Sequence, residues 1–328
     1  MTRKSSGTPP APQLDDLVPV GPWQHRQVHS RGQRFDVAEC GAVGDPMVLL
    51  LHGCTGGWFD FSAQLQPLAD RGFHVVVASL RGWGNSDRTP TGYRADVAAD
   101  DMAGLIRALG HSNALVIGHD LGGVLAWTMA SRHPRLTRAI AVLSAPHPLL
   151  WNLRSVAVRR TGPPATLMWQ LTRPRSSSME DKYQLADVMV DLCGPDFRGS
   201  AQWEQLRDLH RAALAAGAYG PAHSHISWLS HPWSRGRRQW LARLQEYSHV
   251  ARHVGGAAPA LVISGRDDVL TPPEVVQASA ELMVGRDGCL GDGEYPAPLI
   301  IADCGHFPQY ERADVVTAAL ADFAEQTR

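Results

Sequence analysis

The chain has 328 residues, of which 44% are hydrophobic and 19% are charged, and its formal net charge is −1. Such a chain can bury a large core, and its near-neutral charge argues against a surface that binds nucleic acid. No apolar run approaches the roughly 18 residues of a membrane helix, and the N-terminus lacks the apolar stretch of a signal peptide. We expect a soluble, cytoplasmic protein with no membrane span and no nucleic-acid partner.

The cysteines are odd in number, irregularly spaced and without a Cys-x-x-Cys pair. This pattern predicts neither a disulfide framework nor a zinc ribbon. His223 and His225 lack a third convergent ligand, and no His-Glu-x-x-His motif occurs. We therefore expect no metal and no cofactor. The cysteines are Cys40, Cys54, Cys193, Cys289 and Cys304.

Short apolar runs alternate with helical patterns along most of the chain. A loose tail at 1–20 and an antiparallel hairpin at 23–40 are followed by β-branched runs typical of strands that are covered on both faces. The alternation predicts an α/β protein with a mostly parallel sheet of about eight strands, flanked by helices. The runs are 47–53, 74–80, 113–120, 138–146, 260–268 and 297–306, and the helices are 61–71, 95–109, 121–133, 273–284 and 313–326.

The alternation stops after residue 146, and no apolar strand follows until about residue 258. A segment this long cannot be a single loop, so we interpret it as a helical insertion over one end of the sheet. The expected organisation is an α/β core of residues 21–146 and 246–328, with a helical cap of residues 147–245 inserted after strand 6. A second insertion at 285–297 is rich in glycine and predicts a mobile surface loop.

The most informative stretch is Gly-His-Asp-Leu-Gly-Gly at residues 118–123, where a strand ends and a helix begins. A sharp turn of this kind needs small residues around its central side chain, and Gly118, Gly122 and Gly123 provide them. The turn would present Asp120 above the carboxyl edge of the sheet. The alternative is that Asp120 simply caps the helix N-terminus.

Other strand ends supply partners for this carboxylate. The run 260–268 ends in Gly-Arg-Asp-Asp, which offers Asp267 and Asp268 as the acid, and the run 297–306 ends in Gly-His, which offers His306. Because the carboxyl ends of parallel strands meet at one edge, these groups are expected to converge. The order along the chain is nucleophile, acid, histidine, as in the α/β-hydrolase fold.

The ordered motifs resemble those of the α/β-hydrolases, and in particular of the epoxide hydrolase-like branch with an aspartate nucleophile. The resemblance extends from about residue 23 to the C-terminus and is weakest in the cap. Its Gly-x-x-Asp pattern selects Asp268 as the acid. The motifs are His-Gly at 52–53, LRGWGNSD at 80–87, GHDLGG at 118–123, SAPHP at 144–148, GRDD at 265–268 and GHF at 305–307.

An aspartate nucleophile is already anionic near neutral pH, and its productive targets are saturated carbons that carry a leaving group. The resemblance implies an alkyl ester on Asp120, which water then hydrolyses after activation by His306 and Asp268. The backbone amides of Cys54 and Leu121 would form the oxyanion hole.

Two kinds of saturated carbon are candidates for attack. Haloalkane dehalogenases place side-chain N–H donors for the halide after the nucleophile and after the His-Gly pair, where this chain has Leu121 and Cys54. An epoxide instead needs a proton on the oxygen that stays in the product. The family commonly uses two cap tyrosines for this. The nearest match to the later one, residues 227–230, has none, so Tyr219 or His223 is the predicted cap acid.

Large apolar residues indicate a lipophilic substrate, with Trp58, Trp169 and Trp228 as the expected pocket lining. The first interpretation is therefore hydrolysis of a small lipophilic epoxide by water to a vicinal diol, by a monomer or homodimer. Two others stay open. One is another aspartate-nucleophile hydrolase, such as an atypical dehalogenase. The other is a non-catalytic member that binds an apolar ligand.

Overall fold

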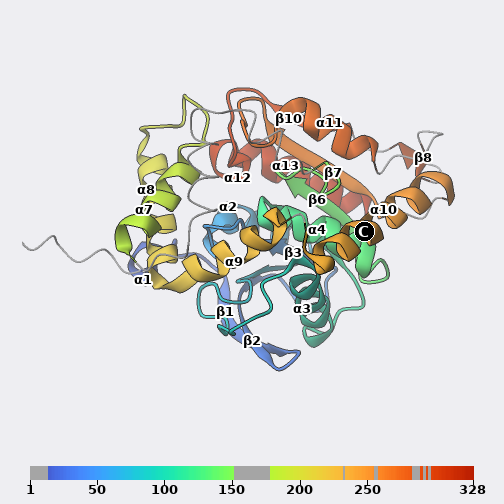
Figure 1. The fold of residues 1–328 in the computed structure, drawn as a ribbon, viewed down its shortest axis with the longest axis horizontal. Coiled ribbons are helices and arrows are strands. Elements are labelled where there is room, and N and C mark those ends of the chain that lie inside the picture. Colours follow the sequence, from blue (N-terminus) through green and yellow to red (C-terminus); the bar gives the residue numbers. More distant parts are fainter. Residues whose placement is uncertain are drawn as a thin grey trace, which may run out of the picture.

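An eight-stranded sheet runs through the computed structural model, which describes residues 14–150, 178–231, 233–254, 258–282, 289–290, 293–294 and 297–328. Its strand order is β1-β2-β4-β3-β5-β6-β7-β10, and Figure 1 shows the whole chain. The strands are β1 (Gln24–Ser30), β2 (Gln33–Cys40), β3 (Met47–Leu51), β4 (His74–Ala78), β5 (Ala114–His119), β6 (Thr137–Leu143), β7 (Ala260–Gly265) and β10 (Leu299–Ile301).

The first two strands form an antiparallel hairpin, and β2 joins the sheet by antiparallel pairing with β4. All later neighbours, from β4 to β10, pair in parallel. The predicted fold, a mostly parallel sheet of about eight strands, is thus confirmed. Its parallel part places the ends of β3, β5, β7 and β10 along one edge, where the predicted site residues follow.

Helices cover both faces of the sheet, which explains why the central strands are apolar throughout. On β3, Val48 and Leu50 pack into the cluster that includes side chains of α2 and α13, whereas Leu49 and Leu51 pack into the cluster formed with α3 and α4. The flanking helices are α2 (Ser62–Asp70), α3 (Ala95–Ala108), α4 (Leu121–Arg132), α11 (Pro273–Glu281) and α13 (Ala313–Gln326), with the short α12 (Pro308–Glu311).

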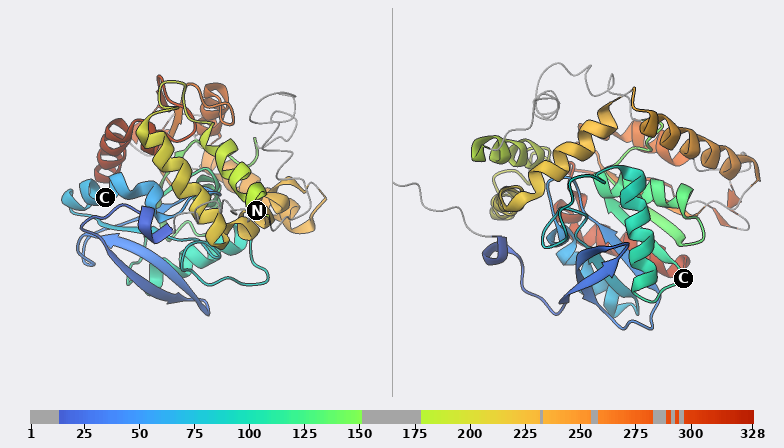
Figure 2. Two further views of the ribbon diagram at one scale, coloured as in Figure 1. Left: turned by 90° about the vertical axis from the view of Figure 1, so that its left-hand side faces the viewer. Right: turned by 60° about the horizontal axis from the view of Figure 1, so that its bottom comes forward.

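The expected insertion between β6 and β7 contains helices, and in the right-hand view of Figure 2 they lie along the top of the molecule. The helix α10 continues past residue 245, the expected end of the cap. We therefore propose that the boundary between cap and core follows α10. The helices are α7 (Met179–Val190), α8 (Ala201–Ala213), α9 (Tyr219–Ser230) and α10 (Arg235–Val254), with a π-helical turn, Leu214–Ala218, between α8 and α9.

The segment predicted as a loose tail, 1–20, lies within the described residues only from residue 14 onward. Residues Leu14–Leu17 form α1, and Leu14, Leu17 and Val18 pack against the cluster on the α2 face. Their spacing puts the three apolar side chains on one side of a helical turn.

Little of the expected loop at 285–297 lies within the described residues. Two short strands, β8 (Cys289–Leu290) and β9 (Gly293–Glu294), pair antiparallel there, and the loop's mobility stays a prediction. Across the described part of the chain, no helix has the length and hydropathy needed to cross a membrane.

Candidate active site

A strained turn joins β5 to α4, and Asp120 is its central residue. Asp120 has φ 49° and ψ −113°, a left-handed conformation that is costly for a residue with a side chain. A Cβ at Gly118 would collide with the carbonyl of Gly122, and a Cβ at Gly122 would collide with the carbonyl of Leu51. The predicted glycine requirement therefore has a direct steric cause.

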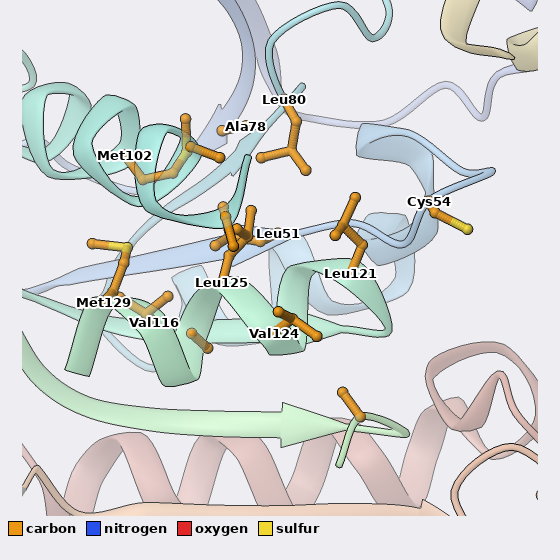
Figure 3. Packing of buried hydrophobic residues seen from close by; sticks show 14 of the residues in the cluster. Leu51, Cys54, Ala78, Leu80, Met102, Val116, Leu121, Val124, Leu125 and Met129 are labelled. Atoms are coloured by element: carbon orange, nitrogen blue, oxygen red, sulfur yellow. The ribbon is translucent and has the colours of Figure 1, made fainter. Parts of the chain in front are cut away.

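The turn brings the Asp120 carboxylate to the loop that follows β3. The backbone N–H of Cys54 donates a hydrogen bond of 2.9 Å to Asp120 Oδ2. Leu121 is the first residue of α4, so its N–H is among those that the helix itself leaves unpaired. Figure 3 shows Leu121 on the first turn of α4. Cys54 lies on the neighbouring loop, near the same end of the helix. The side chain of Asp120 is 18% exposed, which leaves the carboxylate accessible.

The histidine and the acid predicted from the last two strand ends lie together beside this carboxylate. His306 Nδ1 is 3.0 Å from Asp268 Oδ2, and His306 Nε2 is 3.9 Å from Asp120 Oδ1. Among the described residues, His306 Nε2 has no hydrogen-bond partner. The neighbouring carboxylate, Asp267, is exposed. The contacts of Asp268 thus correspond to the expected role of the acid.

Burial and the neighbouring charges shift the pKa values of His306 and Asp268 in opposite directions. Burial lowers the pKa of His306, but the charges of Asp268 and Asp120 and the hydrogen bond that His306 donates to Asp268 outweigh this effect, so the pKa lies above its ordinary value. Burial raises the pKa of Asp268, yet His306 and the amides of Leu270 and Thr271 lower it by more. Asp268 therefore stays ionised and can hold the proton of His306 on Nδ1.

Two further side chains fix the backbone around His306. His119 Nε2 lies 2.7 Å from the His306 carbonyl, and because a carbonyl only accepts, this nitrogen carries the hydrogen. The Glu311 carboxylate accepts hydrogen bonds from the amides of Gly305 and Phe307. The sequence analysis did not identify either residue, although His119 directly precedes the nucleophile.

The predicted cap acids lie at and near the start of α9. Tyr219 is 5% exposed, and its ring centroid lies 6.3 Å from that of the half-buried His223. The choice between them as the acid stays a prediction.

Of the predicted pocket residues, Trp58 packs against Trp23 and His25 of the N-terminal segment, on the α2 face of the sheet. Trp228 packs against Trp240 of α10. Trp169 lies outside the described residues. The lining role of all three therefore stays a prediction.

His225 on α9 is a functional candidate that the sequence analysis did not choose. It is 1% exposed, and neither ring nitrogen has a hydrogen-bond partner within the described residues. Burial lowers its pKa to about 4, and Asp120 is the strongest of the charges that oppose this shift. A signal was present in the sequence, because helical spacing puts His225 on the apolar face with Ala222 and Leu229, and His223 off it.

The model of the alpha/beta hydrolase fold family matches residues 46–313. The chain therefore belongs to the α/β-hydrolase fold family, as the motifs predicted.

Within that family the chain is similar to epoxide hydrolases. It is 25% identical over 338 residues to epoxide hydrolase A of Mycobacterium tuberculosis (strain ATCC 25618 / H37Rv), and the match covers 93% of this chain and 98% of the relative. It is 38% identical over 175 residues to AB hydrolase superfamily protein YfhM of Bacillus subtilis (strain 168), covering 50% of this chain but 59% of that protein. The expected epoxide hydrolase-like branch is confirmed.

A solved structure has the same fold. The crystal structure of epoxide hydrolase A from Mycobacterium thermoresistibile superimposes with a TM-score of 0.67 at 24% identity, covering 92% of this chain and 98% of that one. An identity this low supports the shared architecture alone.

Proposed function

We propose that the protein hydrolyses a small lipophilic epoxide to a vicinal diol through an ester on Asp120. Asp120 Oδ1 attacks a ring carbon, the C–O bond breaks, and its electron pair stays on the epoxide oxygen. Water, deprotonated by His306, then attacks the carboxyl carbon. The bond from this carbon to Oδ1 breaks, and the leaving oxygen takes the proton from the His306 cation, which releases the diol. The N–H groups of Cys54 and Leu121 stabilise the oxyanion on Oδ2 in this second step. Asp268 orients His306 and stabilises its cation.

The observation that carries the proposal is an accessible carboxylate on a strained turn, 3.9 Å from a histidine nitrogen that has no hydrogen-bond partner among the described residues. Asp120 needs no base for attack, so His306 is free for the ester hydrolysis. The similarity to epoxide hydrolases favours an epoxide among the possible electrophiles.

The surroundings also favour an oxygen leaving group over a halide. A halide is stabilised by side-chain N–H donors, but the indole N–H of Trp83 already donates to the Cys54 carbonyl at 3.1 Å. Neither Leu121 nor Cys54 supplies an N–H from its side chain. The buried His225 ring provides an N–H that the described residues leave unused. A single donor that can give its proton suits an epoxide oxygen, which must be protonated, whereas a halide leaves as the anion.

The direct test is a paired panel of lipophilic epoxides and chloroalkanes of matched carbon skeleton, with diol and halide measured separately. We expect diol formation without halide release. Halide release alone would support the dehalogenase interpretation. Binding of the apolar compounds with no turnover of either panel would support the non-catalytic one.

We expect the hydrolysis of the ester to depend on a histidine that is neutral. The rate should rise with pH and level off above the pKa of His306, because only the neutral ring accepts a proton from water. Esterification removes the Asp120 charge, one of the causes that raise this pKa. The midpoint of the rate profile should therefore lie below the midpoint of His306 measured by NMR in the free protein. An equal or higher midpoint would contradict this.

We also expect His225 to serve the first step as the donor to the epoxide oxygen. At neutral pH its ring is uncharged and offers one N–H to the developing alkoxide; the proton it gives is restored from the water that His306 later deprotonates. His225→Phe should slow alkylation about 10²-fold and leave ester hydrolysis almost unchanged. Single-turnover kinetics separates the two steps.

The matched variants are Tyr219→Phe and His223→Ala, which remove the acids predicted from the sequence. If either one slows alkylation while His225→Phe does not, the donor is that residue and the assignment to His225 is wrong.

A further inference from the structure

The loop that carries the oxyanion amide has little intrinsic rigidity. Residues 53–57 comprise three glycines, Cys54 and Thr55, so two side chains are available to hold it. Its function requires a fixed geometry, because the Cys54 N–H must point at Asp120 Oδ2. Small errors in the direction of such a donor reduce its effect on the transition state.

The loop is held from two sides. On one side, the Trp83 indole donates to the carbonyl of Cys54 at 3.1 Å. On the other, the hydroxyl of Thr55 lies 2.9 Å from Nδ1 of His210, a residue of α8 that is 155 positions away in the sequence. The amide that faces Asp120 belongs to Cys54, so both contacts are made by its own residue or by the next one.

A buried carboxylate sets the orientation of the histidine. Asp60, in the short helix Trp58–Phe61 that follows the loop, has Oδ1 3.4 Å from His210 Nε2. Its oxygens accept no hydrogen bond from the described residues, and in that part of the chain His210 is the basic residue that contacts this side chain, which is 2% exposed. Since a carboxylate repels a lone pair, Nε2 carries the hydrogen and Nδ1 accepts from Thr55.

The three residues are thoroughly shielded and lie next to the catalytic histidine. Thr55 and His210 are each 1% exposed. The His210 ring packs edge-on against Phe307, the residue after His306, at 5.3 Å between centroids. A Cβ at Gly56 would collide with the Asp60 carboxylate, which therefore lies directly against the loop backbone.

We propose that Asp60, His210 and Thr55 form a positioning relay that couples α8 to the oxyanion loop and keeps the Cys54 amide on Asp120. The proposal rests on the proposed function for its kinetic consequence. None of the three touches the reacting atoms, so they are positioning residues. A displacement of α8 would release Thr55, and with it the amide.

The relay should act on one chemical step. In alkylation, the Asp120 carboxylate loses charge, so a weakened hydrogen bond to Oδ2 does not slow the attack. In ester hydrolysis, Oδ2 becomes an oxyanion and gains charge, and the Cys54 N–H stabilises it. Disrupting the relay should therefore slow the second step and let the ester accumulate.

The test is Thr55→Val, which keeps the shape of the side chain and removes its hydroxyl. We expect ester hydrolysis to slow about tenfold or more and alkylation to change by less than about twofold. Thr55→Ser should restore the rate. His210→Phe should slow the same step, and the double variant with Thr55→Val should be no slower than the slower single variant, because both act through one contact.

Thr128→Val is the matched control for the loss of a buried threonine hydroxyl. Thr128 Oγ1 accepts from the Trp240 indole at 3.1 Å and donates to Val124, away from the loop. This variant should lower the midpoint of thermal unfolding without changing the ratio of the two rates. A merely structural role for Thr55 would give the same result in Thr55→Val and would overturn the proposal.

A measurement on the protein without substrate tests the relay independently of the proposed function. In protein labelled with ¹⁵N-cysteine, the Cys54 amide resonance should move in Thr55→Val and return in Thr55→Ser. An unmoved resonance would overturn the relay. If no epoxide alkylates Asp120, the proposed function fails, and this resonance still decides whether Thr55 positions the amide.

Discussion

His306→Gln is expected to trap the protein as a covalent ester. Alkylation of Asp120 needs no base, so incubation with an epoxide should convert the variant to a species heavier by the full mass of the epoxide. Ester hydrolysis should slow by about 10²- to 10⁴-fold, because glutamine cannot accept a proton from water. Intact-mass spectrometry follows the adduct over time, and peptide mapping locates it.

The added mass also identifies the electrophile. An epoxide adds as a whole, whereas a haloalkane adds only its alkyl part, since the halide leaves. The wild-type protein, quenched under the same conditions, is the control and should show little adduct at steady state. Slow diol formation by His306→Gln with no adduct at any time would contradict the proposed role of His306.

Asp120→Ala is expected to abolish diol formation, with a loss of about 10⁴-fold or more. The nucleophile acts as a unit with His306 and Asp268, so its removal eliminates the ester route and leaves no alternative carboxylate in the right place. The measurement is the initial rate of diol release at saturating epoxide, together with a thermal unfolding curve to show that the variant is folded.

Asp267→Asn is the matched control for removing a carboxylate near the site. Asp267 is exposed and lies beside Asp268 in sequence, so its loss should change the rate by less than about twofold. A large loss in Asp267→Asn, or appreciable diol formation by Asp120→Ala, would show that the wrong carboxylates were assigned.

The sequence predicted the parts of this site that depend on local patterns. A glycine-flanked aspartate between an apolar run and a helix predicts a sharp strand-to-helix turn. Asp120 has the strained dihedral angles that such a turn implies. The parallel sheet then brings Asp268 and His306 to the same edge, because each follows a strand end.

Contacts across long sequence distances were not predictable in the same way. His210 meets Thr55 only because α8 folds back over the loop, and Glu311 holds the backbone at Gly305 and Phe307 through its carboxylate. The choice among cap residues depended on which face of α9 is buried. The helical period separates His225 from His223, but it does not show what the buried face covers.

The central claim is that Asp120 gives one of its own oxygens to the product, and isotope labelling tests it most directly. A single turnover in ¹⁸O-water, with protein in excess over epoxide, should release a diol that lacks ¹⁸O and leave one ¹⁸O in the peptide containing Asp120. Repeated turnover should then label the diol as well. A diol that carries ¹⁸O from the first turnover, together with an unlabelled Asp120 peptide, would contradict the claim. Water would then have attacked the epoxide itself.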